Sequence, residues 1–177
     1  EEVYIDTSKW VVRYLYAVLK DQESVKFALV SPISVTAKNP NEKVVYVNLS
    51  YKQLWESPAI GVDEPLTREF ETVINDYYGL SAYWPGSGDW GTTDSPQSLQ
   101  NPKLRELVIT PESKCETETH LVRFTELSGR VLTNSEKKLG KIVDLMINEN
   151  SWKIGYLVVD EQRSEERRVG KRVCHRV

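Results

Sequence analysis

Residues 145–157 read LMINENSWKIGYL, and residues 3–15 read VYIDTSKWVVRYL. An offset of 142 positions superposes the two stretches, and each consists of an apolar run, a short polar turn, a Trp and a second apolar run. The turns at 6–9 and 148–151 are rich in Asp, Asn and Ser, whose side chains hydrogen-bond their own backbone in tight turns. A repeat of this kind predicts two copies of one β-hairpin.

Further apolar runs extend the two copies in opposite directions. The first hairpin is followed by β-branched and aromatic runs at 25–30 and 44–47, whereas the second is preceded by runs at 121–132 and 139–145. Each copy therefore supplies strands that the other lacks, and the chain is expected to be mainly β.

The region between the copies predicts two helices. Ser50 and Gln53 have the spacing of a capping box, and the short helix that they begin should stop before Pro58. A longer helix begins at Thr67 and ends at Gly79. Its apolar residues form a stripe at i, i+3, i+4, i+7 and i+8, which is more often a core face than a partner-binding face: Phe70, Val73, Ile74, Tyr77 and Tyr78.

A linker is expected after these helices. From Pro85 to Pro102 the chain is rich in Gly, Ser, Thr, Asp and Pro, with only Trp90 and Leu99 to anchor it. The sequence GSGD at 86–89 superficially resembles a phosphate-cradling loop. Such a loop follows a strand and opens a helix, so we interpret these residues as part of the linker.

The second copy resembles the PRC-barrel family, the small β-barrel shared by the photosynthetic reaction centre H subunit and the C-terminal domain of ribosome-maturation factors. The likeness lies in HLVRFTELSGRV at 120–131, LGKIVD at 139–144 and WKIGYLVVD at 152–160. Residues 48–84 are similar to the segment between the barrels of bacterial proteins that carry two PRC barrels in tandem. Together the resemblance covers most of residues 1–162.

The resemblance implies a mainly β fold of two small PRC-type β-barrels in tandem, joined by a helical segment. The expected division is a first barrel without its N-terminal strands, an inter-barrel helical segment, a linker, a second barrel without its C-terminal strands and a tail: 1–60, 61–84, 85–115, 116–162 and 163–177. The resemblance also implies a set of structural signature positions: Trp10, Tyr14, Gly129, Gly140, Asp144, Trp152, Tyr156 and Asp160. Ser135-Glu136 stands where the family usually has an Asp-Gly turn, which leaves the type of that turn open.

Some of these positions have a backbone reason as well. Gly140 lies within an apolar run and predicts a bulge or a close approach of another backbone segment. Asp144 is expected to bond a turn, and Trp10 and Trp152 are expected to plug the ends of their barrels.

Two incomplete barrels would expose unpaired strand edges, which invite aggregation. We therefore expect the strands of residues 121–160 to recruit the late strands of the first copy, residues 25–47, into one composite barrel, with the Phe70 helix covering what is left. Two separate, frayed sheets are the alternative. Hydrogen-bonded pairing between the two regions distinguishes them.

The last fifteen residues differ in character from the rest. They carry six Lys or Arg against two Glu, and the run at 163–171 has neither strand alternation nor a helical stripe. One reverse translation of that run resembles the start of a widely used short-read sequencing adapter. We therefore interpret the tail as an assembly artefact, in preference to a solvated charged terminus or a basic patch for nucleic acid or anionic lipid.

Without the tail the chain is acidic. Residues 1–162 hold 17 basic and 24 acidic side chains, a net charge of −7, which repels phosphate backbones and excludes nucleic acid as the expected partner. No stretch approaches the roughly eighteen uninterrupted apolar residues of a membrane span. Cys115 and Cys174 have no second pair with which to form a framework, which favours a reducing, cytoplasmic location.

Groups that could carry chemistry are few. His120 is flanked at alternate positions by Glu116 and Glu118, but a metal needs three or four convergent ligands, so we expect neither a metal site nor catalysis there. The adjacent carboxylates Asp63 and Glu64 lie beside a Pro and fit turn and capping roles. Several aromatic residues could stack bases or sugars, but they lack interleaved Lys and Arg and are expected to pin the helix and linker onto a barrel: Tyr77, Tyr78, Tyr83, Trp84 and Trp90.

These observations predict a non-enzymatic protein–protein interaction or scaffold module with no cofactor and no metal. Two alternatives remain open. One is an accessory protein of photosynthesis or stress like the H subunit, which would require an N-terminal membrane helix. The other is an RNA-processing accessory like the ribosome-maturation factors. Self-association through open barrel edges is a further expectation.

Overall fold

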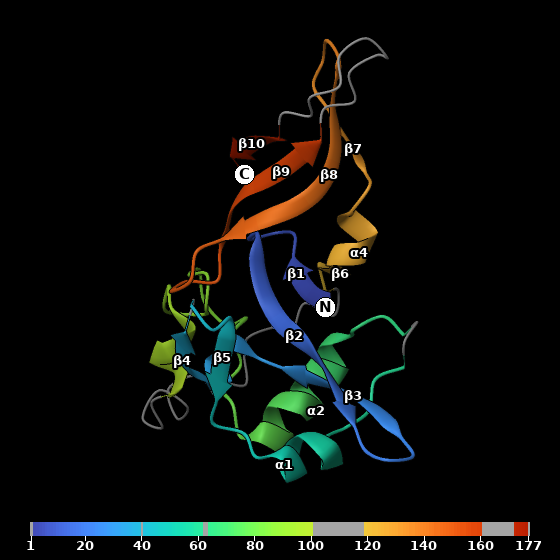
Figure 1. The fold of residues 1–177 in the computed structure, drawn as a ribbon. Helices are drawn as coiled ribbons and strands as arrows, with labels where there is room; N and C mark the ends of the chain where they lie inside the picture. The colour runs from blue at the N-terminus through green and yellow to red at the C-terminus, as the bar shows by residue number, and fades with distance from the viewer. Residues whose placement is uncertain (1, 40, 62–63, 101–118, 161–171, 177) are drawn as a thin grey trace.

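The computed structural model describes residues 2–39, 41–61, 64–100, 119–160 and 172–176, the last of these for the backbone alone. The protein is mainly β, as the sequence predicts, and its strands form three small antiparallel sheets (Figure 1). Within the described residues none of the three closes into a barrel, so the expected tandem barrels are not observed there.

The strands of the first sheet come from both copies of the repeat. This sheet has the order β3-β2-β1-β6, with β1 at Glu2–Asp6, β2 at Val11–Lys20, β3 at Val25–Val30 and β6 at Leu121–Arg123. The second sheet has the order β10-β9-β8-β7, with β7 at Val131–Thr133, β8 at Lys138–Ile147, β9 at Ile154–Asp160 and β10 at Arg172–Arg176. The third pairs β4, Val35–Asn39, with β5, Val44–Val47.

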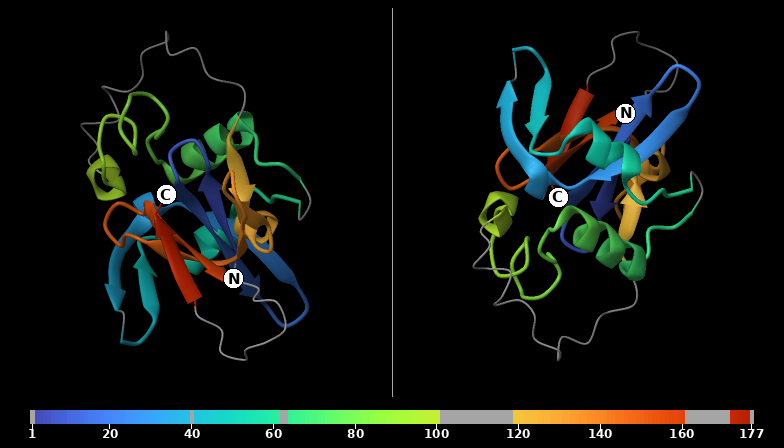
Figure 2. Two further views of the ribbon diagram at one scale, coloured as in Figure 1. Left: turned by 90° about the horizontal axis from the view of Figure 1, so that it is seen from above. Right: turned by 90° about the horizontal axis from the view of Figure 1, so that it is seen from below.

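The two predicted helices are present with the predicted caps. In α1, Tyr51–Glu56, the Ser50 hydroxyl accepts from the Gln53 backbone N–H at 3.2 Å, while the Gln53 side chain accepts from the Ser50 N–H at 2.9 Å. The longer α2, Arg68–Tyr78, has Thr67 as its N-cap and ends at Gly79 in the left-handed conformation. Viewed from below, both helices lie across the strands of the first sheet (Figure 2). Short helical turns complete the elements: η1 Pro32–Ser34, η2 Pro96–Gln100 and α4 Phe124–Leu127.

The turns of the two hairpins have matching hydrogen bonds. The Asp6 carboxylate accepts from the backbone N–H two and three residues later, at 3.0 and 3.3 Å, and the Asn148 side chain does the same at 2.9 and 3.0 Å. The equivalent residues Trp10 and Trp152 both have positive φ, 54° and 59°. Backbone of this kind is strained for a bulky side chain, so its occurrence at both sites reflects one shared turn geometry.

The two hairpins also bond to each other. The Val12 N–H donates to the Trp152 carbonyl at 2.9 Å, and the Ile154 N–H donates to the Trp10 carbonyl at 2.7 Å. The donors are equivalent positions of the repeat, and so are the acceptors. An isolated bridge pairs Val11 with its equivalent, Lys153, between them.

The composite barrel predicted from the sequence is wrong in its strand pairing. Among the described residues, β3 pairs with β2 and β4 with β5, and no strand pairing joins residues 25–47 to residues 121–160. The copies are joined instead through β1 with β6 and through the contact between the hairpins. Short hairpin loops cost little entropy to close, so the late strands of the first copy pair with their neighbours in sequence.

A single core lies beneath both copies. Its buried apolar side chains come from the first and the second hairpin alike, and they include Ile5, Val12, Ile154 and Val159. Residues 85–100, expected as a linker, pack against this core. Trp90 is fully buried and Leu99 nearly so, and both are therefore anchors as predicted. The rest of the expected linker, 101–115, lies outside the described residues.

The buried face of α2 differs in part from the predicted stripe. Three of the five stripe residues are fully or partly buried: Phe70, Ile74 and Tyr78. Val73 and Tyr77 are exposed, and the buried face holds Arg68 and Glu71 instead. These two charges form an ion pair of 2.6 Å, and such pairing is what lets them occupy a core position.

Part of the tail pairs with the second sheet. Strand β10 runs antiparallel to β9, with Arg172 opposite Asp160 and Arg176 opposite Tyr156. This pairing was not expected from the sequence. The pairing provides hydrogen-bond partners for backbone groups on the edge of β9 that would otherwise be open. An open edge of this kind can pair with any extended backbone, because the bonds do not involve side chains. Residues 163–171, which carry the likeness to an adapter, lie outside the described residues.

Candidate functional site

An apolar groove lies between the β4–β5 hairpin and the turn that joins β8 to β9. We call it the hairpin groove, and its volume is about 290 Å³. The first wall comes from the β4–β5 hairpin and the second from the β8–β9 hairpin: Lys38, Asn39, Lys43, Val44 and Val45 face Ile147, Glu149 and Trp152. Both walls are hairpins, so the groove lies where two separate pairs of strands meet.

The floor of the hairpin groove is the second repeat's Trp. Trp152 is buried, and the Lys38 ammonium lies 5.2 Å from the centroid of its ring in a cation–π contact. Burial lowers the pKa of Lys38, although the Glu149 carboxylate partly opposes this. Val44, Val45 and Ile147 remain 36–44% exposed, so the apolar lining is open to solvent.

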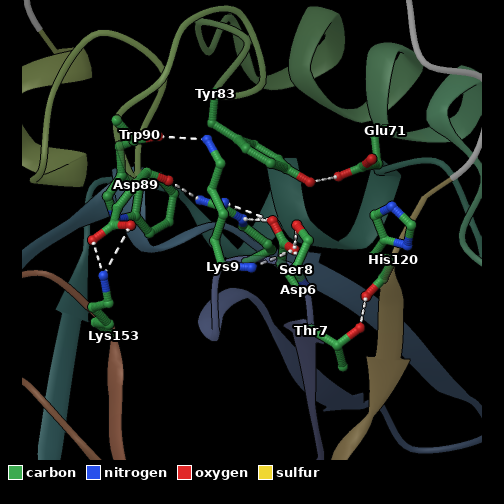
Figure 3. Close-up of polar contacts among 12 residues, drawn as sticks. Asp6, Thr7, Ser8, Lys9, Glu71, Tyr83, Asp89, Trp90, His120 and Lys153 are labelled. Atoms are coloured by element: carbon green, nitrogen blue, oxygen red, sulfur yellow. Dashed lines mark hydrogen bonds and ion pairs between the residues drawn. The ribbon is translucent and has the colours of Figure 1, made fainter. Parts of the chain in front are cut away.

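A buried polar cluster includes Asp6 and Tyr83 (Figure 3). Arg13 is fully buried, and its Nε and Nη2 donate to the Asp6 carboxylate at 3.1 and 2.7 Å. Its guanidinium lies 4.0 Å from the ring centroid of Tyr83 and 4.9 Å from that of Trp90. Burial opposes ionisation of Asp6, but Arg13 and hydrogen bonds from Ser8 and the Lys9 backbone outweigh it, so the pKa of Asp6 is lowered.

A second buried ion pair adjoins the first. Arg68 Nη1 donates to Glu71 at 2.6 Å and to the Tyr83 hydroxyl at 3.2 Å, and that hydroxyl donates to the other Glu71 oxygen. Burial raises the pKa of Glu71 in spite of the Arg68 charge. The pKa values of Tyr14 and Tyr83 are raised well above 10 by burial and by the neighbouring Glu71. Both tyrosines are therefore neutral, and the Tyr83 hydroxyl hydrogen-bonds to Arg68 and Glu71.

The segment that contains Trp90 ties this cluster to the second hairpin. Arg13 Nη1 donates to the Asp89 carbonyl at 2.6 Å, and the Asp89 carboxylate accepts from Lys153 Nζ at 2.9 Å. The Trp90 indole donates to the Ser151 carbonyl at 2.7 Å. Asp89 and Trp90 therefore connect the Arg13 cluster to the second hairpin.

The signature positions implied by the resemblance do not gather in one place. Trp10 and Trp152 meet where the hairpins touch, whereas Tyr14 is 1% exposed and its equivalent Tyr156 is 41% exposed. No closed barrel is seen among the described residues, so neither Trp plugs a barrel end there. The carboxylate of Asp144 accepts from the N–H of the next residue within β8, at 2.8 Å, in place of bonding a turn.

The glycine positions fit a backbone role. A Cβ on Gly140 would lie 2.4 Å from the Asp160 carbonyl oxygen, and the β7–β8 pairing is irregular at this point. The close approach predicted at Gly140 is thus confirmed, and it also involves the signature residue Asp160. Gly129 has φ of 80° with open space around it.

Of the groups considered for catalysis or metal binding, His120 and Glu64 lie within the described residues. The His120 side chain is exposed, and its carbonyl accepts from the backbone and hydroxyl of Thr7 (Figure 3). Cys115, Glu116, Glu118 and Asp63 lie outside the described residues. Glu64 accepts from the Gly61 N–H at 3.2 Å, which is the turn role expected for it. The described residues contain no group of three or more His, Cys, Asp or Glu placed to hold a metal ion.

The aromatic residues expected to pin the linker are only partly core residues. Tyr83 and Trp90 are buried and stack around Arg13, whereas Tyr77 is exposed. Neither Arg13 nor Arg68 was predicted from the sequence as a functional residue. A signal for the first exists, because Arg13 interrupts an otherwise apolar run, and a lone cation at such a position needs a buried partner.

Comparisons with known protein families, with curated proteins and with solved structures find no match for this chain. In the part of the chain that the structure describes, no helix has the length and apolar composition required to cross a membrane.

Proposed function

We propose that this chain is a non-catalytic protein–protein interaction module, related to the tandem PRC-barrel proteins, and that it binds its partner in the hairpin groove. The repeated hairpin with its paired Trp residues supports the relationship. The observation that most directly supports this function is the groove of about 290 Å³, whose apolar lining is open to solvent.

The composition of the groove favours binding over chemistry. Its apolar lining is concentrated at Val44, Val45, Ile147 and Trp152, which suits an apolar side chain of a partner. The described residues that line it include no Ser, Cys or His that could act as a nucleophile or be paired as an acid and base.

The charge at the groove gives the partner a preferred composition. Among the described residues that line it, Lys38 and Lys43 are accompanied by a single carboxylate, Glu149. A partner segment with an apolar anchor and a flanking Asp or Glu would therefore match both the lining and the charge.

The test is selection of short peptides from a random display library on the wild-type protein, followed by affinity measurements on two variants. Val45→Asp places a charge in the groove, and Val25→Asp places the same charge on β3, outside the groove lining, at a Val of comparable exposure, 55% against 44%. We expect selected peptides with an apolar anchor and acidic flank, and at least about a tenfold loss of affinity in Val45→Asp alone. Peptides that bind both variants equally well would refute the groove as the binding site.

A further inference from the structure

A small polar pocket lies beside the buried cluster, away from the hairpin groove. Its volume is about 70 Å³, and it lies between the β1–β2 turn, the start of α2 and the start of β6. The residues that decide its chemistry are Lys9, Arg13, Arg68, Trp84 and His120. We call it the Arg68 pocket.

Arg68 has a donor edge for which the described residues provide no acceptor. The residue is 8% exposed, and its Nη1 is engaged by Glu71 and by the Tyr83 hydroxyl. Its Nε is buried and has no hydrogen-bond partner among the described residues, and none of them accepts from Nη2. The Trp84 ring, 4.4 Å from the guanidinium carbon, stacks on the group and fixes its plane. A buried donor left unpaired is unfavourable, so this edge favours an acceptor from outside the chain.

The neighbouring charges favour an anion as that acceptor. Lys9, Arg13 and Arg68 line the pocket together with His120, and among the described residues the single lining carboxylate is Asp6. The Asp6 oxygens already accept from Arg13, Ser8 and the Lys9 backbone. The other nearby carboxylate, Glu71, is engaged at both oxygens. The remaining positive charge is therefore not neutralised within the pocket.

Size and geometry select the kind of anion. A single water needs about 10–15 Å³ of such space, so a pocket of about 70 Å³ admits a group of a few heavy atoms and excludes a nucleotide or a sugar. Nε and Nη2 of a guanidinium form a planar fork that matches the two oxygens of a carboxylate. We propose that the Arg68 pocket binds one carboxylate group, held side-on by this fork, with Lys9 and His120 beside it.

The direct test follows the Arg68 Nε–H signal by NMR while sodium acetate is titrated against sodium chloride at constant ionic strength. We expect a saturable shift with acetate and none with chloride. The Nε–H of Arg130, which donates to the Glu126 carbonyl on the exposed surface, is an internal control that should not move. An equal shift with chloride, tighter binding of inorganic phosphate, or no saturation with acetate would each overturn the assignment.

Two variants test the residues by calorimetric titration with acetate. Arg68→Lys keeps a cation beside Glu71 but removes the fork, and it should weaken acetate binding at least tenfold, whereas Arg130→Lys should leave it unchanged. If Arg68→Lys does not fold, His120→Glu replaces an exposed side chain, so the fold is retained, and its carboxylate should compete for the pocket and weaken acetate several-fold. Unchanged affinity in His120→Glu would overturn the proposal.

A last arm identifies the source of the carboxylate. A peptide with a free C-terminal carboxylate is compared with its C-terminal amide. Tighter binding of the acid than of acetate, lost in the amide, supports the end of a partner chain, and binding of acetate without either peptide supports a small free carboxylate. The outcome does not depend on the hairpin groove, so this proposal and the proposed function can fail separately.

Discussion

Arg13 is a cation that the fold encloses completely, and the Asp6 carboxylate is its counter-charge. Replacing Asp6 with Asn keeps the Oδ1 atom that bonds the turn but leaves a buried guanidinium without its ion pair. We expect Asp6→Asn to lower the free energy of unfolding by about 3 kcal/mol at pH 7. Urea denaturation measures this, with Asp21→Asn, an exposed carboxylate, as the control that should change little.

The pH dependence of this loss has a definite sign. The folded pKa of Asp6 lies below its ordinary value of 3.8, so the unfolded state binds more protons between the two values and stability rises with pH there. The contribution is complete above the unfolded pKa and is lost as the pH falls through the folded one. The difference between wild type and Asp6→Asn should therefore shrink from pH 5 towards pH 2. A constant difference over that range would contradict the ion-pair origin of the effect.

Gly140 is a position where the sequence alone predicted a close approach. Its φ is 145°, and a Cβ added there would lie only 2.4 Å from the Asp160 carbonyl oxygen, which leaves no room for a side chain. We expect Gly140→Ala to lower the free energy of unfolding by about 3 kcal/mol through strain and clash together. Gly129→Ala meets strain without a clash and should cost about 1 kcal/mol.

Gly155→Ala is the matched control for these glycines, because its Cβ would lie 4.0 Å from its nearest neighbour, the Met146 carbonyl oxygen. It should change stability by less than about 0.5 kcal/mol. Thermal unfolding of the three variants gives the order directly. Equal effects at Gly140 and Gly155 would show that β8 and β9 do not approach as described.

Gly140 and Arg13 differ in how much of their structural role can be predicted from the sequence. A glycine inside an apolar run already signals a backbone that admits no side chain, and that signal is local. The partners of Arg13 come from the β1–β2 turn and from the loop that precedes η2, so their convergence depends on the complete fold. The Arg68 pocket was not predictable for the same reason, since it joins the first hairpin to α2 and to β6.

Helix α2 has features that neighbouring residues determine and features that depend on tertiary packing. Its ends were predictable, because the Thr67 cap and the Gly79 terminus are properties of neighbouring residues. Its buried face was only partly predictable, because Arg68 and Glu71 mimic a polar surface in the sequence while neutralising each other in the core. Apolar periodicity has no means of detecting such a pair.

The Thr67 cap provides a test at this scale. Its hydroxyl accepts from the Phe70 N–H at 3.3 Å, and Thr67→Ala should lower the free energy of unfolding by about 1 kcal/mol. Thr72→Ala is the matched control within the same helix. The Thr72 hydroxyl donates to the Arg68 carbonyl one turn earlier, a bond that does not stabilise helices, so this variant should be neutral or slightly stabilising. A larger loss in Thr72→Ala than in Thr67→Ala would contradict the capping role.

At the scale of the whole molecule, the sequence predicted the repeat and the mainly β class but not how the copies join. Each hairpin is specified by its own turn residues, so its existence is local. How the copies join depends on which open strand edges meet, as in the pairing of β1 with β6 and the contact between Val11 and Lys153. Hydrophobic alternation is the same for every candidate edge, so the sequence does not identify the edges that pair.

The tail is the part of the molecule whose contribution is most directly measurable. Among the described strands, β10 occupies the end of the second sheet and pairs with β9 alone. We expect deletion of residues 163–177 to preserve the fold and to change the melting temperature by less than about 4 °C, the equivalent of about 1 kcal/mol. A drop well beyond this, with circular dichroism of both proteins as the check on folding, would show that β10 is an integral strand.

The hydrogen bonds between Val12 and Trp152 and between Ile154 and Trp10 form a reciprocal pair, because equivalent positions donate and equivalent positions accept. This symmetry suggests how such a protein could have arisen. An isologous interface needs nothing beyond two copies of one surface, so separate chains that each carried a single hairpin could associate through it as a homodimer. Duplication and fusion of the gene would then make that dimer covalent. Once joined, the halves would be free to diverge, and the equivalent residues Tyr14 and Tyr156 do differ, one being buried and the other exposed.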